Sequence, residues 1–173
     1  MKRTLAFLLL LVLAVGLVAC ADETAPDGMI NASTDSAKFN LYVPEGWFSQ
    51  AEDGISGALA PLGDANVIVT AHLLEEDYGT PEVFWQKRCE PEYAAYLPEF
   101  TLVEAECGEA IMGGINAQKY VFTMKKGNAT YKYQQLIILD YNMAYVLQYT
   151  AELSVYGNYA DDVASIVSNF ALR

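Results

Sequence analysis

Histidine is the side chain that most often serves as a general base, and this chain has only one, His72. It lies in an alternating stretch, Val67 to Leu74, that is typical of a β-strand. A catalytic triad or a Cys–His site would have to use this residue, and a usual multi-histidine metal site is excluded. The alternation favours a simpler interpretation, in which His72 faces solvent or a polar neighbour. We therefore predict no catalytic residue, no metal ligand and no cofactor.

Carboxylates are the other groups that could do chemistry. Glu75-Glu76-Asp77 follows a predicted strand, and Glu104, Glu106 and Glu109 form a second cluster. Neither cluster has the spacing of an EF-hand, so a solvated surface is the favoured interpretation. Folding could still bring two carboxylates together as a hydrolase pair, and such an enzyme, acting on envelope or exported substrates, is the alternative function.

Cys20 ends a segment with the three zones of an export signal. Lys2 and Arg3 give it a basic start, residues 5–18 are almost wholly apolar, and Leu17-Val18-Ala19-Cys20 closes it. The apolar run is shorter than the roughly 20 residues of a membrane span. The ending resembles the lipobox of bacterial lipoproteins, in which the cysteine thiol takes a diacylglyceryl group. The resemblance implies a signal peptide at 1–19, lipidation of Cys20, and anchoring at the extracytoplasmic face of the cell membrane. An ordinary secretory signal is the alternative.

Residues 20–37 are small, polar and acidic, with Pro26 and Gly28 among them. We interpret them as the lipidated cysteine and a flexible tether. The remaining residues, 38–173, are enough for a single domain with one core. Acidic side chains outnumber basic ones by 22 to 10, which gives a formal charge of −12 and excludes a nucleic-acid partner. We expect a monomer whose partners are the membrane, through the lipid, and an unknown envelope protein or small ligand.

Cys89 and Cys107 are the two cysteines that remain after lipidation. An even pair in an exported protein favours a disulfide, which here would join a helix to the following strand. Two buried free thiols are the alternative. A redox-active pair is not indicated, because the chain has no Cys-x-x-Cys spacing.

Tyrosines recur on two neighbouring strands of a predicted hairpin, and they are the candidate binding surface. Tyr131 and Tyr133 share one strand, and Tyr145 and Tyr149 share the next, so each pair lies on one face of its own strand. Exposed tyrosines would form a contact surface for a peptide or sugar, with Trp47 as a further candidate. The favoured interpretation is structural, with half-buried rings that pair across strands.

Hydrophobic periodicity and turn residues place these side chains on a simple succession of elements. Thr80-Pro81-Glu82 predicts a helix start, and Pro91 is expected to end or kink that helix. Trp85, Cys89, Tyr93 and Leu97 give the helix a stripe that faces the core. A second helix is expected from Tyr156 to Phe170, and strands are predicted over 39–43, 55–60, 66–74, 100–106, 118–124, 130–139 and 144–151.

The two ends of the predicted domain carry a further resemblance. Phe39-x-Leu41-x-Val43-Pro44-x-Gly46-Trp47 opens it, and Phe170-Ala-Leu-Arg173, preceded by a helix, closes it. With the order of elements between them, these ends resemble the PsbP-like superfamily. That group includes the extrinsic PsbP subunit of photosystem II, a Ran-binding nuclear import factor and small bacterial lipoproteins. The resemblance implies an α+β fold, an α/β/α sandwich in which helices flank an antiparallel β-sheet.

The same resemblance implies a role in binding or assembly. We therefore predict a membrane-anchored extracytoplasmic lipoprotein that acts as a non-catalytic binding or accessory module at the cell surface.

Overall fold

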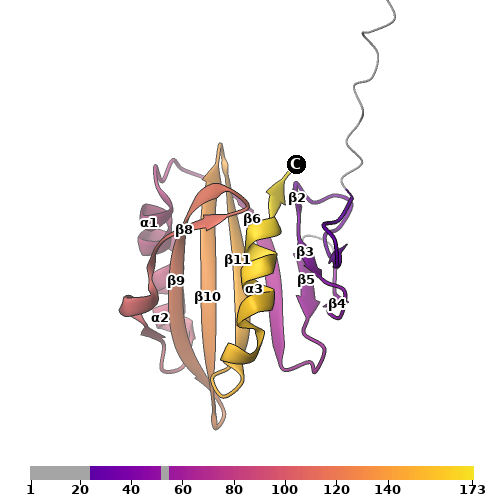
Figure 1. Cartoon of the computed structure of the whole chain (residues 1–173). Coiled ribbons are helices and arrows are strands. Elements are labelled where there is room, and N and C mark those ends of the chain that lie inside the picture. Colours follow the sequence, from indigo (N-terminus) through magenta and orange to yellow (C-terminus); the bar gives the residue numbers. More distant parts are fainter. Residues whose placement is uncertain (1–23, 52–54) are drawn as a thin grey trace, which may run out of the picture.

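An antiparallel sheet of eight strands forms the centre of the described residues, 24–51 and 55–173, of this computed structural model (Figure 1). The strand order is β4-β5-β6-β11-β10-β9-β7, and β8 also pairs with β9. The strands are β4 (Phe48–Ser49), β5 (Ile55–Leu59), β6 (Ala65–Leu73), β7 (Thr101–Leu102), β8 (Gly108–Met112), β9 (Ile115–Lys126), β10 (Ala129–Asp140) and β11 (Met143–Glu152). The long central strands β6, β11, β10 and β9 carry about half of the buried apolar residues.

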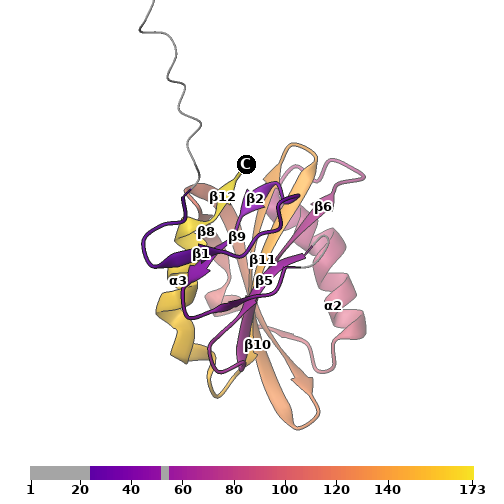
Figure 2. The ribbon, with the colours of Figure 1, turned by 90° about the vertical axis from the view of Figure 1, so that its right-hand side faces the viewer.

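Helices cover both faces of this sheet (Figure 2). On one face lies α3 (Ala160–Asn169) with β1 (Met29–Asn31) and β3 (Tyr42–Pro44), and their apolar side chains form the larger core cluster. On the other face, α1 (Pro81–Phe84) and α2 (Glu90–Tyr96) form a second cluster with β9, β10 and β11. The prediction of an α+β fold with helices on both sides of an antiparallel sheet is confirmed.

The helix that begins at Pro81 starts as predicted, since the Thr80 hydroxyl accepts a hydrogen bond from the Val83 N–H at 3.4 Å. Pro91 does not end it. Instead, a π-helical turn, Trp85–Cys89, joins α1 to α2, and the Glu90 N–H bonds to the Trp85 carbonyl. Proline has no N–H for the carbonyl four residues earlier and its ring crowds that carbonyl, so the regular ladder is interrupted around it. The core-facing stripe survives this change.

The hairpin of β10 and β11 has a turn at Tyr141 and Asn142, with Asp140 opposite Met143. This register puts odd-numbered residues of β10 and even-numbered residues of β11 on the face of α1 and α2. Ile137 and Val146 are examples, and both belong to the second core cluster. The other alternate residues point toward α3.

Two expectations about elements are wrong. The predicted strand over 100–106 is limited to β7, because a 3₁₀ turn, Glu104–Glu106, follows it and carries the chain into β8. Residues 29–37 are not a flexible tether, since β1 pairs with β3 and Met29 and Ala32 are buried in the core. Hydrogen bonds and two apolar contacts outweigh the polar composition of this segment.

The two ends of the domain meet beside the sheet. Strand β2 (Phe39–Asn40) pairs with β12 (Ala171–Leu172), and Arg173 Nε donates to Asn40 Oδ1 at 2.7 Å. Arg173 Nη1 also lies 3.1 Å from the Ala37 carbonyl. Among the residues described, no helix is long and apolar enough to cross a membrane. The predicted signal peptide and Cys20 lie outside the described residues.

Candidate functional site

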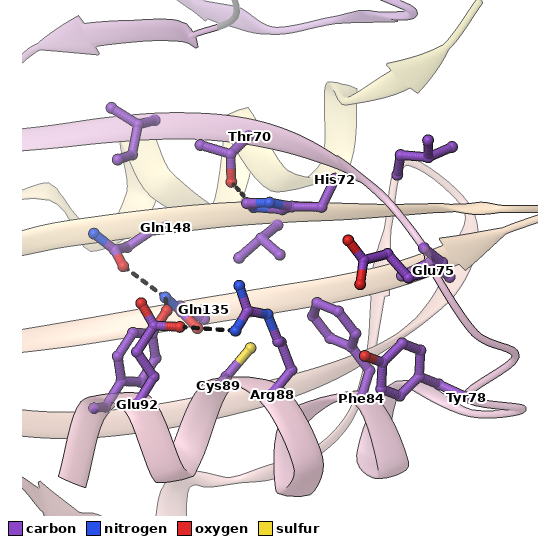
Figure 3. A pocket seen from close by; sticks show the side chains of 15 residues that line it. Thr70, His72, Glu75, Tyr78, Phe84, Arg88, Cys89, Glu92, Gln135 and Gln148 are labelled. Atoms are coloured by element: carbon purple, nitrogen blue, oxygen red, sulfur yellow. Dashed lines mark hydrogen bonds and ion pairs between the residues drawn. The ribbon is translucent and has the colours of Figure 1, made fainter. Parts of the chain in front are cut away.

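A cavity of about 630 Å³ lies between the α1–α2 helix and strands β6, β11 and β10 (Figure 3). We call it the Gln135 cavity, after the residue at its inner end. Volumes of roughly 300–1,000 Å³ are typical of small-ligand sites. Its lining residues come from the α1–α2 helix, from strands β6, β10 and β11, and from the loop between β6 and α1: Ile68, Thr70, His72, Leu73, Leu74, Glu75, Tyr78, Phe84, Arg88, Cys89, Glu92, Tyr93, Gln135, Val146 and Gln148.

The strand side of the cavity carries a chain of polar side chains. Gln135 and Gln148 lie opposite each other on β10 and β11, and Ile68 is the next partner across, on β6. Gln135 Nε2 donates to Gln148 Oε1 at 2.6 Å and to the Tyr93 hydroxyl at 2.7 Å. Gln148 Nε2 in turn donates to Thr150 Oγ1 at 3.2 Å. On this wall of the cavity, the amides of Gln135 and Gln148 therefore lie beside the aliphatic side chains of Ile68 and Val146.

Gln135 is 1% exposed, and its Oε1 has no hydrogen-bond partner among the described residues. A buried polar atom without a partner costs about 1–3 kcal/mol, and proteins retain few of them. Trp85 Nε1 likewise has no hydrogen-bond partner among the described residues. The Trp85 ring belongs to the second core cluster and stacks on Tyr120, with ring centres 4.0 Å apart. An aliphatic residue at position 135 would remove this penalty together with the two hydrogen bonds that Nε2 donates, so the glutamine brings the fold little net stability.

The helix side of the cavity carries a thiol, Cys89, and a phenol, Tyr93, and both are protonated at neutral pH. Burial raises the pKa of the Cys89 thiol to about 12, with a further rise from Glu92, so the sulfur is protonated at neutral pH. Burial likewise raises the pKa of Tyr93 to about 12. Neither group is a nucleophile or a base in this state, because the thiolate and phenolate are the reactive forms.

Charged side chains lie at the rim. Arg88 and Glu92 come from consecutive turns of the helix, and Figure 3 shows Arg88 extending toward the β6 side of the cavity and Glu92 turned toward Arg88. Arg88 Nη1 lies 3.5 Å from Glu92 Oε2, with side chains 65% and 52% exposed. Glu75 lines the rim beyond the end of β6.

His72 pairs with Thr70 Oγ1 through Nε2 at 2.9 Å. Burial, and then the nearby Arg88 charge, lower the pKa of His72 below its usual value, so the ring is neutral at pH 7. The prediction that this histidine lies on a strand beside a polar neighbour is confirmed. Its partner is a hydroxyl rather than a carboxylate, which does not provide the orientation of a catalytic triad.

The four candidate tyrosines do not form one surface, because the two pairs point to opposite faces of the sheet. Tyr131 and Tyr133 point toward the α2 side, while Tyr145 and Tyr149 point toward α3. Tyr145 and Tyr149 are 5% and 1% exposed. Spacing within a strand shows which residues share a face of that strand, but only the hairpin register relates the faces of two strands.

Trp47, the remaining member of the predicted surface, is also buried. It is 2% exposed, its Nε1 donates to Asp162 Oδ2 at 2.9 Å, and its ring meets Tyr159 edge-on at 5.7 Å. Tyr133 instead stacks on Phe122, with ring centres 4.9 Å apart. The structural interpretation of these aromatic residues holds.

The predicted disulfide is absent, since Cys89 and Cys107 are both free thiols. Cys107 Sγ accepts a hydrogen bond from the Val121 N–H at 3.3 Å and lies 3.5 Å from the Val103 carbonyl. Cys89 lines the cavity from the π-helical turn. Each sulfur therefore has its own packing environment, and an even count of cysteines did not indicate a bond.

The cavity residues Gln135, Gln148, Arg88 and Glu92 were not identified from the sequence. A signal for the first two was present, because each glutamine lies two residues from an apolar residue on the same strand face, Ile137 on β10 and Val146 on β11. With a two-residue turn at 141–142, positions 135 and 148 are opposite each other. The position of Arg88 depends on the π-helical turn, for which Pro91 is the sequence signal.

No protein-family model matches the sequence, and no curated protein matches it. Solved structures do match the fold. The cyanobacterial PsbP protein CyanoP from Synechocystis sp. PCC 6803 has a TM-score of 0.59 at 11% identity, over 91% of this chain and 100% of that one. The sequences are too distant to carry residue roles.

Two further solved structures have the same architecture. LpqN, described as involved in cell envelope biogenesis of Mycobacterium tuberculosis, has a TM-score of 0.56 at 16% identity, over 83% of this chain and 90% of that one. The Ran-binding protein Mog1p of Saccharomyces cerevisiae has a TM-score of 0.58 at 11% identity, over 83% and 95%. The fold is therefore PsbP-like.

Proposed function

We propose that this protein is a lipid-anchored extracytoplasmic binding module without catalytic activity, and that it binds a small polar ligand in the Gln135 cavity. The observation that carries this proposal is the unpartnered Gln135 Oε1 at the inner end of a polar cavity. Residues that lower stability without structural reason are commonly found at functional sites.

The chemistry of the cavity supports binding over catalysis. Its thiol and phenol are protonated, and its histidine is paired with a hydroxyl. The alternative hydrolase needs two carboxylates with one of them buried, so that it can act as the acid. The carboxylates that line the cavity are Glu75 and Glu92, and both are exposed.

The anchor is supported by the lipobox resemblance at Cys20. Because Met29 already belongs to the folded domain, only residues 21–28 separate the proposed lipid from the first strand. Even fully extended, a segment of this length reaches no more than about 30 Å. The domain would therefore work close to the membrane surface.

Fractionation of Cys20→Ser tests the anchor. The wild-type chain is expected in the membrane fraction, with an acylated cysteine as its first residue by mass spectrometry, and the variant in the soluble fraction. Cys107→Ser is the matched control and should remain with the membrane. Membrane retention of Cys20→Ser, or an unmodified first residue, would contradict the anchor.

Equilibrium dialysis tests the cavity. The purified lipidated protein is dialysed against a pool of amino acids, tripeptides, monosaccharides and disaccharides, and retained compounds are identified by mass spectrometry. We expect wild-type protein to retain at least one class and Gln135→Leu to lose it. Trp47→Phe, changed on the opposite face of the sheet, should retain it. Identical retention by wild type and Gln135→Leu would refute the site.

A further inference from the structure

The charges at the mouth of the Gln135 cavity are of both signs and are only weakly paired with each other. Among its lining residues, Arg88 is the cation, and Glu75 and Glu92 are the carboxylates. A single contact of 3.5 Å between two exposed side chains contributes little, about 0–1 kcal/mol. A ligand can therefore compete for both Arg88 and Glu92 at small cost.

The interior of the cavity offers neutral hydrogen-bonding groups beside apolar ones. Gln148 and Thr70 are half-buried, and Gln148 is fixed by Gln135, whereas the His72 ring that pairs with Thr70 is exposed. Ile68, Val146 and Phe84 supply apolar surface between them. Amide and hydroxyl groups next to aliphatic walls are suited to peptide groups with small side chains.

We infer that the ligand of the Gln135 cavity is a short peptide with both termini free. Its carboxylate pairs with Arg88, its ammonium group with Glu92 or Glu75, and its peptide groups with Gln148 and Thr70. This inference rests on the proposed function, because it specifies the ligand class of the same site. Gln135 acts as a positioning residue, which holds the Gln148 amide through the 2.6 Å hydrogen bond.

Other ligand classes match the charges less well. A neutral sugar would leave the three rim charges unused, a multivalent anion would meet two carboxylates, and a simple cation would meet Arg88. A zwitterion complements both signs, and the Arg88 guanidinium is suited to hold a carboxylate through two parallel hydrogen bonds. A volume of about 630 Å³ corresponds to a ligand of drug-like size, which for a peptide means a few residues.

The test uses the full-length lipidated protein in detergent and three tripeptide libraries of the same composition. One library has free termini, one has amidated C-termini and one has acetylated N-termini. Equilibrium dialysis should show retention of free tripeptides, and each block should weaken binding about tenfold, as expected for the loss of one charge-assisted contact. The wild-type comparison needs no variant and so does not depend on the folding of a mutant.

Variants then locate the two termini. Arg88→Gln should bind the free and amidated libraries equally, and Glu92→Gln should lose most of the preference for a free amine. Lys87→Gln is the matched control, because Lys87 is on the same helix but lies 3.9 Å from Glu76 and does not line the cavity. It should behave as the wild type does.

The outcomes separate this inference from the proposed function. No retention of tripeptides, or equal retention of all three libraries, would overturn the peptide assignment. If mono- or disaccharides were then retained by wild type and lost by Gln135→Leu, the cavity would still be a binding site with a different ligand class. If wild type and Gln135→Leu retained the same compounds, both proposals would fail.

Discussion

Gln135 and Gln148 face each other on adjacent strands, and their side-chain amides are joined by a hydrogen bond of 2.6 Å. Gln148 can reach solvent in the cavity, whereas Gln135 is 1% exposed and leaves its carbonyl oxygen unpaired. One amide of the pair is therefore accessible to a ligand, and the other holds it in place while leaving its own carbonyl oxygen without a partner among the described residues. This asymmetry leads to the first prediction.

Gln135→Leu removes an unsatisfied buried carbonyl, but it also removes the two hydrogen bonds that Gln135 Nε2 donates to Gln148 and Tyr93, so we expect the free energy of unfolding to change by no more than about 1 kcal/mol. Urea denaturation measures the change. Gln86→Leu, the same substitution at an exposed position of the π-helical turn, should alter stability by no more than about 0.5 kcal/mol. A loss of more than about 2 kcal/mol in Gln135→Leu would mean that the carbonyl is satisfied in solution.

The two buried tryptophans should respond differently to replacement by phenylalanine. Trp47→Phe loses a hydrogen bond to the Asp162 carboxylate and is expected to lower stability by about 2 kcal/mol. Trp85→Phe loses ring area too, but its Nε1 has no acceptor among the described residues, so the cost should be smaller. Thermal or urea unfolding of both variants makes the comparison, and equal losses would contradict the assigned hydrogen bond.

Thiol labelling of the native protein should count two free cysteines besides Cys20. Cys107 should react with iodoacetamide before Cys89, because Cys89 is buried and its raised pKa, about 12, leaves almost no thiolate at pH 8. Mass spectrometry without a reducing agent measures both. A mass lower by two hydrogens, with no labelling of either residue, would show the disulfide instead.

His72 should make stability depend on pH in a defined direction. Its pKa in the folded chain lies below the unfolded value of about 6.5, so the unfolded chain takes up the proton first as pH falls. The contribution of neutral His72 to the free energy of unfolding is therefore complete above pH 6.5, and it is lost as the pH falls from 6.5 toward the lower pKa of the folded chain. Relative to His72→Gln, wild type should therefore lose more stability between pH 7.5 and 5. Parallel pH profiles would contradict the lowered pKa.

Arg173 should hold the N-terminal segment onto the domain. Arg173→Ala removes the bond to Asn40 and the contact with the Ala37 carbonyl, and we expect a loss of about 1 kcal/mol, moderated by solvent exposure. Arg173→Lys, which keeps the charge but not the planar fork, should recover only part of it. Hydrogen exchange of residues 34–37 should speed up in both variants, and unchanged exchange would show that strand pairing alone holds this segment.

The sequence predicted those parts of the fold that depend on neighbouring residues better than those that depend on contacts between distant residues. Thr80, Pro81 and Glu82 predicted a helix start because capping involves neighbours only. The strand over 100–106 failed because a 3₁₀ turn, closed by backbone hydrogen bonds, replaced the expected extended chain after Leu102. The tether was assigned from composition, which does not show that Met29 and Ala32 find a core made by distant strands.

The site depended even more on long-range relationships. Tyr145 and Tyr149 share a strand face, as alternation requires, but the hairpin register turned that face toward α3 and away from Tyr131 and Tyr133. The same register brought two glutamines together. Cavity charges on a helix and on a strand came together only through packing of that helix on the sheet.

Residue order by itself determined the secondary-structure types, the acidic charge and the resemblance to an exported, lipid-modified chain, because these follow from composition and near-neighbour spacing. Tertiary structure alone decided which faces meet, which sulfurs stay apart and where an amide is buried without a partner. Those outcomes depend on strand register and on the packing of one helix, which involve residues far apart in the chain.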